Sequence, residues 1–333
     1  MTSYVGLLQQ GLFYGFLTVL LVSTAIAVLY TYCRSHFESL SAEARATLLF
    51  NLCVLPVVVM ALLLLSALLP SLLQILGMGS DHCEGHTEGH IHFCLIHRPA
   101  LLDSWLLSGS AFVFLGMLTA IVGNILVDVS RSWRFRKVLA NYQTVSVRDS
   151  VHVLASDLPI AFSWGIWSPR IIVSTGLLKV LSPEERAIVI AHEKTHMSRR
   201  DGLFGLMARA FSIVHIPQIR KHLLTDWHLA NEQLCDKTAA KLTQDPGAVA
   251  ELLLKMERLY QAHFPFRGAP VLGVMGNDSS KLPARIEELL KPVASESCVS
   301  WLLPCAVLVT LMLFGVHDQI HEAFEHALGL LID

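Results

Sequence analysis

The chain has 333 residues, of which 53% are hydrophobic and 16% are charged. Its mean hydropathy is +0.53, whereas about a quarter of the residues in a soluble globular chain are charged. This composition excludes a disordered, a collagen-like and a nucleic-acid-binding protein. The formal net charge of -2 says little by itself, so the positions of the charged residues carry the argument.

Long segments of the chain carry no charged side chain. No Lys or Arg precedes Arg34, and three later segments lack Asp, Glu, Lys and Arg altogether: 46–80, 104–127 and 297–317. A helix needs about 20 apolar residues to cross the hydrocarbon core of a bilayer. We therefore predict a mainly α-helical membrane protein with four transmembrane helices. The predicted spans lie near 6–32, 47–77, 105–128 and 298–316.

The basic residues are concentrated in two segments. Of the 25 Lys and Arg residues, all but Arg98 lie in 34–45 or 131–291. Cytoplasmic loops of membrane proteins carry an excess of Lys and Arg. We therefore expect both segments on the cytoplasmic side and both chain termini outside. The first span has no basic segment before it, unlike a cleaved signal peptide, and should remain in the protein.

The predicted spans divide the chain into three parts. Residues 1–130 contain three spans and an extracytoplasmic loop at 78–104, and residues 297–333 contain the fourth span and a short outside tail. Residues 131–296 are numerous enough for one cytoplasmic domain with its own core. In that part, short β-like runs at 144–147, 152–155 and 171–174 predict a small antiparallel sheet, and helical sequence follows after Leu181.

One helix of this domain carries a motif with metal chemistry. Residues 182–185, Ser-Pro-Glu-Glu, form a capping box that fixes the start of the helix. Residues 192–196 read His-Glu-Lys-Thr-His, and histidines four residues apart lie on one face of a helix. His192 and His196 can therefore bind one Zn²⁺, with Glu193 as the base that takes a proton from water. The alternative interpretation is two core histidines beside a solvated glutamate.

A catalytic zinc site has three protein ligands, so we expect another ligand downstream. Residues 223–242 read as a helix on which His228, Glu232 and Asp236 lie on one face. Carboxylates four residues apart repel each other unless a cation lies nearby. We therefore assign Glu232 as the third ligand and Asp236 as the acceptor from a ligating imidazole. His228 is the alternative ligand, and a solvated acidic face is the alternative interpretation of the two carboxylates.

Five short motifs of this region occur together in a known family. They are Pro-Ile-Ala-Phe at 159–162, Ser-Pro-Arg-Ile-Ile-Val at 168–173, the capping box, the His-Glu-Lys-Thr-His motif followed by Arg-Arg-Asp at 199–201, and Glu-Gln-Leu-Cys-Asp at 232–236. Together they resemble the BlaR/MecR-type membrane zinc metallopeptidases over about 130–295. The resemblance implies a cytoplasmic α+β zincin protease domain of the gluzincin-like type in the bacterial inner membrane. It also implies that His192, His196 and Glu232 bind zinc, that Glu193 is the general base, and that Asp236 accepts a hydrogen bond from a ligating imidazole.

The same resemblance implies a biological setting. In that family an outside receptor end senses a signal, and the protease inside cleaves itself or acts on a transcriptional repressor. The resemblance therefore implies a signal-responsive zinc endopeptidase that acts on a protein or peptide. Receptors of β-lactams in the family carry a penicillin-binding domain after the fourth span, whereas this chain ends about 17 residues beyond it. We therefore expect no β-lactam sensing through such a domain.

Two other functions remain open. HtpX-like quality-control proteases share the two motifs but place a membrane hairpin between them. Only residues 197–231 lie between the motifs here, which are too few for two spans. We expect the apolar run Leu203–Ile219 to be a helix that packs on the membrane face or on other helices. The second alternative is a non-enzymatic, metal-sensing membrane receptor with a structural zinc site, which would not need Glu193.

Substrate handling is open to more than one interpretation. The run Arg170–Thr175 is either an edge strand that aligns an extended peptide or an ordinary core strand. His215 and His263 are candidate donors to a tetrahedral oxyanion. A lone histidine is more often structural, so we leave both out of the catalytic set.

The segments placed outside are rich in metal-binding side chains. Half of the 16 histidines of the chain lie there, and imidazole and thiol groups suit zinc or copper. We predict a second metal site outside, against the alternative of a polar loop closed by a disulfide between Cys83 and Cys94. The candidate ligands are His82, Cys83, His86, His90, His92, Cys94 and His97 in the loop, with His317, His321 and His326 in the tail.

Overall fold

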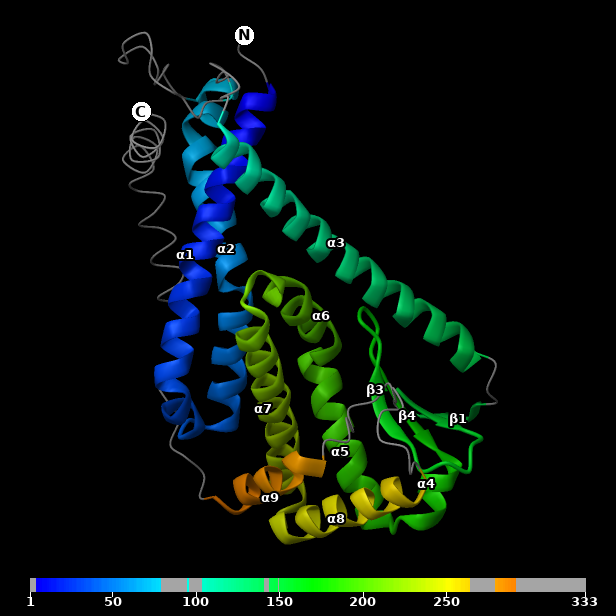
Figure 1. Ribbon diagram of the computed structural model, residues 1–333. Coiled ribbons are helices and arrows are strands. Elements are labelled where there is room, and N and C mark those ends of the chain that lie inside the picture. Colours follow the sequence, from blue (N-terminus) through cyan, green and yellow to red (C-terminus); the bar gives the residue numbers. More distant parts are fainter. Residues whose placement is uncertain are drawn as a thin grey trace.

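Three long helices form the upper half of the molecule (Figure 1). The structure is a computed structural model that describes residues 4–78, 95, 104–140, 144–148, 150–263 and 279–291. The long helices are α1 (Tyr4–Glu38), α2 (Ala42–Ile75) and α3 (Trp105–Ala140). All three are long and apolar enough to cross a membrane, and they correspond to the first three predicted spans.

Several predictions fall on residues that the structure does not describe. The fourth span, near 298–316, is one of them. The candidate outside metal site is another, both in the loop and in the tail. The candidate ligands in the loop are His82, Cys83, His86, His90, His92, Cys94 and His97, and those in the tail are His317, His321 and His326.

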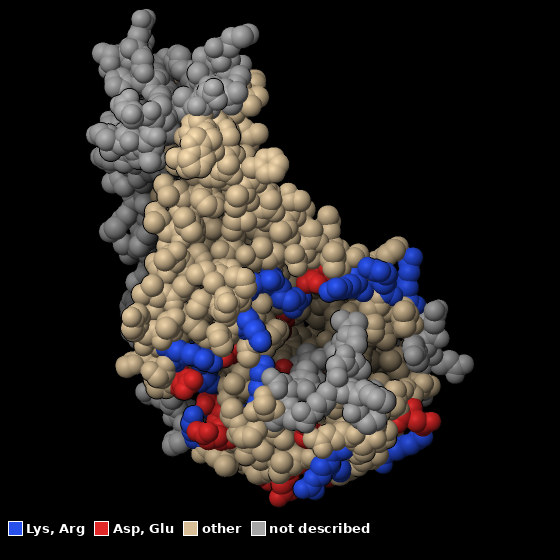
Figure 2. Space-filling model, in the orientation of Figure 1, with Lys and Arg blue, Asp and Glu red and all other residues tan. Residues whose placement is uncertain are grey.

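Charged side chains occupy the lower half of the molecule (Figure 2). The described surface of the upper half shows almost none, while Lys, Arg, Asp and Glu cluster over the part that contains the sheet. Large apolar side chains on the upper helices are exposed, among them Trp105 at 82% and Phe112 at 80%. Exposed apolar surface of this extent is typical of a region that contacts lipid.

A small sheet lies below the end of α3. It consists of β1 (Thr144–Arg148), β2 (Val151–Leu154), β3 (Ala161–Trp164) and β4 (Arg170–Ser174) in the order β1-β2-β4-β3. Strands β1 and β2 pair antiparallel, as do β3 and β4, but β2 and β4 pair parallel. The prediction of an antiparallel sheet was therefore wrong for one pairing, and it missed β3.

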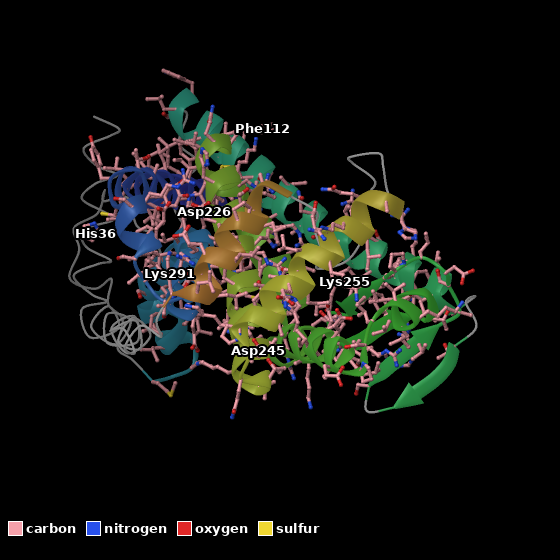
Figure 3. All side chains as sticks on the ribbon, turned by 90° about the horizontal axis from the view of Figure 1, so that it is seen from below. His36, Phe112, Asp226, Asp245, Lys255 and Lys291 are labelled. Atoms are coloured by element: carbon pink, nitrogen blue, oxygen red, sulfur yellow. The ribbon has the colours of Figure 1, made fainter. Side chains whose placement is uncertain are left out.

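The remaining described elements are helical. They are α4 (Thr175–Val180), α5 (Pro183–Arg199), α6 (Asp201–Phe211), the 3₁₀ turn η1 (Ser212–Val214), α7 (Pro217–Thr243), α8 (Pro246–His263), the 3₁₀ turn η2 (Ser279–Lys281) and α9 (Leu282–Leu290). Helices α5 and α7 pack side by side, and α8 and α9 contact both each other and α7. Seen from below, α8 and α9 lie across the lower face (Figure 3).

One apolar core holds the sheet to these helices. It includes Ile171 and Val173 of β4, Ile188 and Val189 of α5, and Leu252 of α8, all of them buried. The buried residues of β4 do not alternate as in a surface strand, because both faces of the strand are covered. Ile171 and Val173 pack in this core, and Ile172 packs in a second cluster with Leu154 and Phe162. This core fixes α5 between the sheet and α7.

Helix α6 and the start of α7 form a hairpin that rises between α3 and the α1–α2 pair (Figure 1). The predicted single helix over Leu203–Ile219 is therefore wrong, because α6 ends at Phe211 and Pro217 begins α7. Nε2 of His215, at the bend, donates to the Leu52 carbonyl oxygen at 3.1 Å. Arg209 of α6 pairs with Asp128 of α3 at 2.9 Å. The α6–α7 hairpin of the lower half thus contacts α2 and α3 through a hydrogen bond and an ion pair.

Candidate metal centre

Helix α5 presents two imidazole rings on one face. Its start is the expected capping box, in which Ser182 and Glu185 exchange hydrogen bonds between side chain and backbone. With the register fixed in this way, His192 and His196 lie one turn apart, and their Nε2 atoms are 3.2 Å from each other. Both rings are buried, at 7% and 3% exposure. Two nitrogen donors therefore converge on one point.

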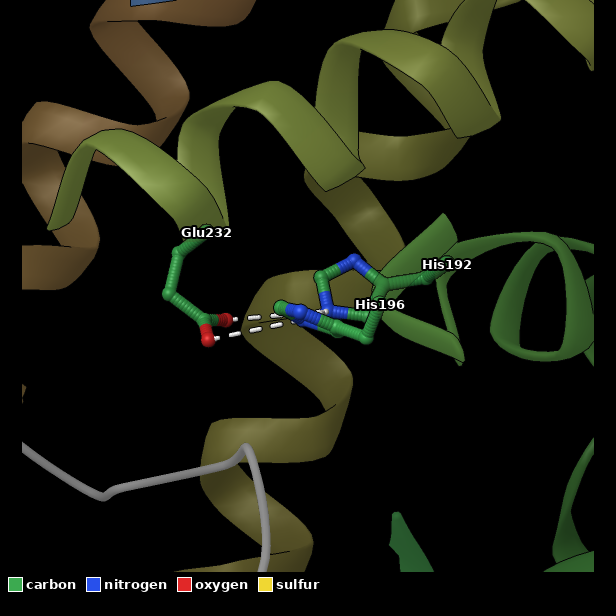
Figure 4. Close-up of side chains that lie close together, drawn as sticks. All are labelled: His192, His196 and Glu232. Carbon is green, nitrogen blue, oxygen red and sulfur yellow. Dashed lines mark hydrogen bonds and ion pairs between the residues drawn. The ribbon is translucent and has the colours of Figure 1, made fainter. Parts of the chain in front are cut away.

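Glu232 of α7 faces these rings from the opposite side (Figure 4). Its carboxylate oxygens lie 3.6 Å from Nε2 of His192 and 3.6 Å from Nε2 of His196. One ligand atom from each of the three residues falls within 4.8 Å of the others. The structure therefore brings together the three residues that the sequence singled out as ligands.

The spacing of these atoms can be compared with that of a tetrahedral metal site. Ligand bonds of about 2.05 Å at a tetrahedral angle place neighbouring ligand atoms about 3.3 Å apart. The observed separations of 3.2 Å and 3.6 Å bracket this value. Burial alone would lower the pKa of His192, but hydrogen bonds and charges of Asp236 and Glu232 raise it to about 10. The site thus favours a positive charge, and its donors fit a divalent metal.

Carboxylates hold the far side of each imidazole ring. Nδ1 of His192 lies 3.0 Å from Asp236, and Nδ1 of His196 lies 2.6 Å from Asp201. Carboxylates in this position fix the ring orientation of metal-binding histidines. Asp236 lies where the sequence predicted it, whereas the role of Asp201 was missed. The only signal for Asp201 was its place in the Arg-Arg-Asp motif that follows the second histidine.

Glu193 is enclosed completely. Its side chain is 0% exposed, and within the described part of the chain neither carboxylate oxygen accepts a hydrogen bond of good geometry. Burial raises the pKa of this carboxyl. A buried carboxylate without donors is unfavourable in a purely structural setting, so its position beside the three candidate ligands calls for a role in chemistry.

One further member of the site, Arg285, was not predicted from the sequence. Arg285 of α9 donates two hydrogen bonds of 2.8 Å to the carboxylate of Asp236. It also lies 3.2 Å from Glu232. Burial would raise the pKa of Asp236, but the charge of Arg285, the hydrogen bonds from His192 and Arg285, and the charge of His192 together hold that pKa below its usual range. No motif surrounds this arginine, so its role is visible only in three dimensions.

The other histidines of the lower half lie elsewhere. His228 is not one of the three grouped donors; it is an exposed residue, and its ring packs on Trp227 with centroids 4.9 Å apart. His215 lies at the bend of the α6–α7 hairpin. His263 is exposed at the end of α8. Neither His215 nor His263 is among the three grouped donors.

An open cleft of about 780 Å³ leads to the centre. Its walls come from the lower end of α3, the turn between β3 and β4, the junction of α5 and α6, and α7. Residues that line it include Asp128, Trp164, Gly165, Arg200, His196 and Glu232. Two of the candidate ligands thus face a space large enough for several residues of an extended peptide.

Two curated relatives match parts of this chain. The plastoglobule-localized metallopeptidase 48 of the chloroplast from Arabidopsis thaliana is 28% identical over 117 residues, which cover 32% of this chain and 34% of the relative. A protease HtpX homolog from Thermoplasma acidophilum is 43% identical over 53 residues, which cover 15% and 17%. The chain thus spans about a third or less of the relatives that it matches. No solved structure shows a significant match.

A family comparison covers more of the chain. The sequence model described as BlaR1 peptidase M56 matches residues 112–286, which is more than half of the protein. The matched region begins in α3 and ends in α9, and it contains every residue of the candidate metal centre. Three of its helices are also long and apolar enough to cross a membrane. The chain belongs to the BlaR1 peptidase M56 family.

Proposed function

We propose that this protein is a zinc-dependent endopeptidase that uses His192, His196 and Glu232 as metal ligands and Glu193 as general base. The observation that carries the proposal is the buried Glu193 carboxylate, which lacks a good hydrogen-bond donor in the described part of the chain. It lies next to three donors at tetrahedral spacing. A receptor with a purely structural metal site would gain nothing from this carboxylate and would bear the cost of burying it.

The residues around the site can perform peptide hydrolysis. When bound, zinc supplies a Lewis acid that polarises a carbonyl group and lowers the pKa of water. Glu193 takes a proton from the attacking water and passes it to the leaving amine. Burial raises the pKa of Glu193, which helps one group both to accept and to donate a proton. Asp236 and Asp201 keep the two imidazole rings in place.

Strand β3 supports binding of an extended peptide. It is an edge strand, because within the described residues it pairs with β4 alone. The backbone N–H of Ser174 donates to the Ile160 carbonyl oxygen at 2.9 Å. In an antiparallel pair every second residue bonds to the partner strand, so the backbone groups of Ala161 and Ser163 point away from β4 to the free edge. The backbone of Ser163 lies beside Glu193. A substrate strand added here would therefore pass the metal centre.

The proposed setting is the bacterial inner membrane, with four spans, both termini outside and the peptidase half in the cytoplasm. The distribution of Lys and Arg along the sequence supports this orientation. We propose that the natural substrate is the protein itself or a cytosolic regulator, such as a transcriptional repressor, and that a signal from outside controls its cleavage.

The change Glu193→Gln tests the proposal directly. It removes the proton acceptor and leaves the ligands, so the variant should bind zinc as the wild type does but should not cleave. The measurement is zinc content together with cleavage of the protein itself or of casein, in detergent, with and without a chelator. Glu184→Gln is the matched control, because it changes an exposed carboxylate of the same helix. Wild-type cleavage by Glu193→Gln, or cleavage that survives complete zinc removal, would sink the proposed mechanism.

An HtpX-like quality-control protease is the second candidate. The match to the HtpX homolog favours it. The connection between the motifs weighs against it, because 197–231 forms the end of α5, α6, η1 and part of α7 and includes no candidate span. Quality control predicts cleavage of many unfolded membrane proteins at many sites. A regulatory peptidase predicts one or a few fixed sites, which mass spectrometry of the products would show.

A further inference from the structure

Helix α9 covers the deep side of the metal centre. Its Arg285 is 49 residues away from Asp236 in the sequence. Helix α9 contributes Arg285, whose guanidinium group lies between Asp236 and Glu232 at 2.8 Å and 3.2 Å. Two carboxylates one helical turn apart repel each other. Arg285 offsets that repulsion, so the orientation of Glu232 and of the ring held by Asp236 depends on where α9 lies.

Helix α9 is held against α7 by polar contacts on its other residues. Nε2 of Gln233 donates to the Ala284 carbonyl oxygen at 2.9 Å. The ammonium group of Lys237 lies 2.6 Å from the carboxylate of Glu288. Gln233 and Lys237 follow Glu232 and Asp236 directly in the sequence. The same two turns of α7 therefore bind α9 and point toward the metal centre.

A residue of the membrane helices completes this arrangement. Arg45 lies in the first turn of α2, next to the tight connection from α1. Its Nη1 donates to the Glu38 carbonyl oxygen at 3.1 Å. Its Nη2 donates to Oε1 of Gln233 and lies 3.7 Å from Glu288. One guanidinium group thus joins the α1–α2 connection, α7 and α9.

The contacts of Arg45 are buried. Arg45 is 8% exposed, Gln233 4% and Glu288 3%. Burying charged groups is unfavourable unless they are paired in good geometry. Removal of one partner leaves the other charge buried and uncompensated. Arg34 offers a comparison within the same protein. It also joins a long helix to α7, through Asp226 at 3.1 Å, but its side chain is 45% exposed and, within the described part of the chain, it makes no polar contact with α9.

We propose that Arg45 is a positioning residue of the metal centre, acting through Gln233 and Glu288 to hold α9 where Arg285 pairs with Asp236 and Glu232. The connected end of the α1–α2 pair is thereby tied to Glu232 through Arg45, helix α9 and Arg285. This inference rests on the proposed function only for the presence of a metal at the centre.

The test is a double-mutant cycle on the full-length protein in detergent. The variants are Arg45→Gln, Arg285→Gln and the double change, with Arg34→Gln as the matched control. The measurements are Co²⁺ affinity, by competition with a chelator, and the visible absorption spectrum of bound Co²⁺, which reports ligand geometry. Neither measurement requires cleavage of a peptide.

We expect Arg285→Gln to weaken Co²⁺ binding by about 10–100-fold, the range found when a group behind a metal ligand is lost. Arg45→Gln should weaken binding in the same direction and shift the spectrum in the same way. Because Arg45 acts through Arg285, the double change should be no weaker than Arg285→Gln alone. Arg34→Gln should leave affinity and spectrum at wild-type values, and Arg45→Lys should restore part of the affinity.

Either of two outcomes would overturn the proposal: wild-type affinity in Arg45→Gln, or additive effects in the double change. If Arg45→Gln does not fold, the same cycle with Arg45→Lys and Arg285→Lys should show smaller losses of affinity in the same direction, again without additivity. A protein that follows the cycle but cleaves nothing would contradict the proposed function and leave the positioning role intact. Additive effects together with an inactive Glu193→Gln would contradict the positioning role and leave the proposed function intact.

Discussion

Glu232 and Asp236 lie on one face of α7 but have different surroundings. Glu232 faces the Nε2 atoms of both histidines at 3.6 Å, whereas Asp236 faces Nδ1 of His192 and the guanidinium group of Arg285. Two carboxylates of similar chemistry are thereby assigned different tasks. The first can contact a metal, and the second can only act on a group that does.

The two alanine variants should therefore differ. Glu232→Ala should lose most of its zinc, because one of the three proposed ligands is removed. Asp236→Ala should keep a site with affinity weaker by about 10–100-fold. It should also melt at a lower temperature, because Arg285 is left buried without its main partner. Zinc content after dialysis and thermal melting measure both effects.

His228→Ala is the control for this pair. Its ring lies outside the group of three donors, so its zinc content should equal that of the wild type. Full zinc in Glu232→Ala combined with loss in His228→Ala would transfer the ligand role to His228.

At the scale of single residues, the sequence predicted the parts of the site that follow a helical period. His192 and His196, and likewise Glu232 and Asp236, are four residues apart, and a helix alone brings each pair onto one face. The contacts of Arg285 and Arg45 depend on helices that meet only after folding. A lone arginine carries no spacing to read, so these roles could not be predicted.

Among the elements, the turn between β3 and β4 decides whether the edge strand reaches the cleft. Gly165 in this turn has a φ of +123° and lines the cleft. A Cβ atom at this position would lie 2.6 Å from the Ser168 carbonyl oxygen. Only glycine adopts such a conformation without strain.

Gly165→Ala should therefore destabilise the protein by about 1–3 kcal/mol, the cost of a strained backbone conformation. It should also raise KM for peptide cleavage more than it lowers kcat, because β3 would shift while the ligands on α5 and α7 stay in place. Thermal melting and steady-state kinetics check the two effects. Gly116→Ala in α3 is the control, since a Cβ atom there meets nothing within 4 Å. Equal stability of the two variants would contradict the argument.

The elements were predicted best where local signals mark their ends. The capping box located the start of α5, but β3 is short, and Ala161–Trp164 has no run of β-branched residues. The parallel pairing of β2 with β4 joins strands that are not neighbours in the chain, so no turn sequence announces it. The break between α6 and α7 had one signal, Pro217, which begins the new helix.

On the scale of the whole molecule, the membrane helices and the peptidase half share their apolar cores. Leu49 and Leu52 of α2 pack in one cluster with Leu223 and Trp227 of α7. A second cluster joins α1, α2 and α3 to the hairpin bend. Its members include Val19, Met60, Phe114, Ala210 and Val214. Neither half covers these side chains by itself.

A fragment limited to 131–296 should consequently fail to fold as it does in the intact chain. It should aggregate or melt without a cooperative transition, because the apolar faces of α6 and α7 would be exposed to water. Calorimetry and zinc binding in the absence of detergent test this expectation. A soluble fragment with cooperative melting and wild-type zinc affinity would show that the shared cores are dispensable.

Composition and charge placement were enough to predict a membrane protein with its basic segments on one side. The predicted division into a membrane part and a separate domain stays a prediction. Hydropathy alone does not show that α6 and α7 rise between the long helices. That arrangement depends on tertiary contacts such as the hydrogen bond from His215 to Leu52.

Helix α3 runs unbroken for 36 residues, or about 54 Å at 1.5 Å per residue, while the hydrocarbon core of a bilayer is about 30 Å thick. Its outer end would lie in the membrane, and its inner end carries Asp128 on the wall of the cleft and Phe135 against Trp164 of β3. In a continuous helix of this length, a small rotation at one end moves the other end by several ångströms. A tilt of about 5° about its outer end would move the inner end by about 5 Å, which is close to the 4.8 Å between neighbouring strands of a sheet. The mouth of the cleft would then widen or narrow by the width of one peptide strand.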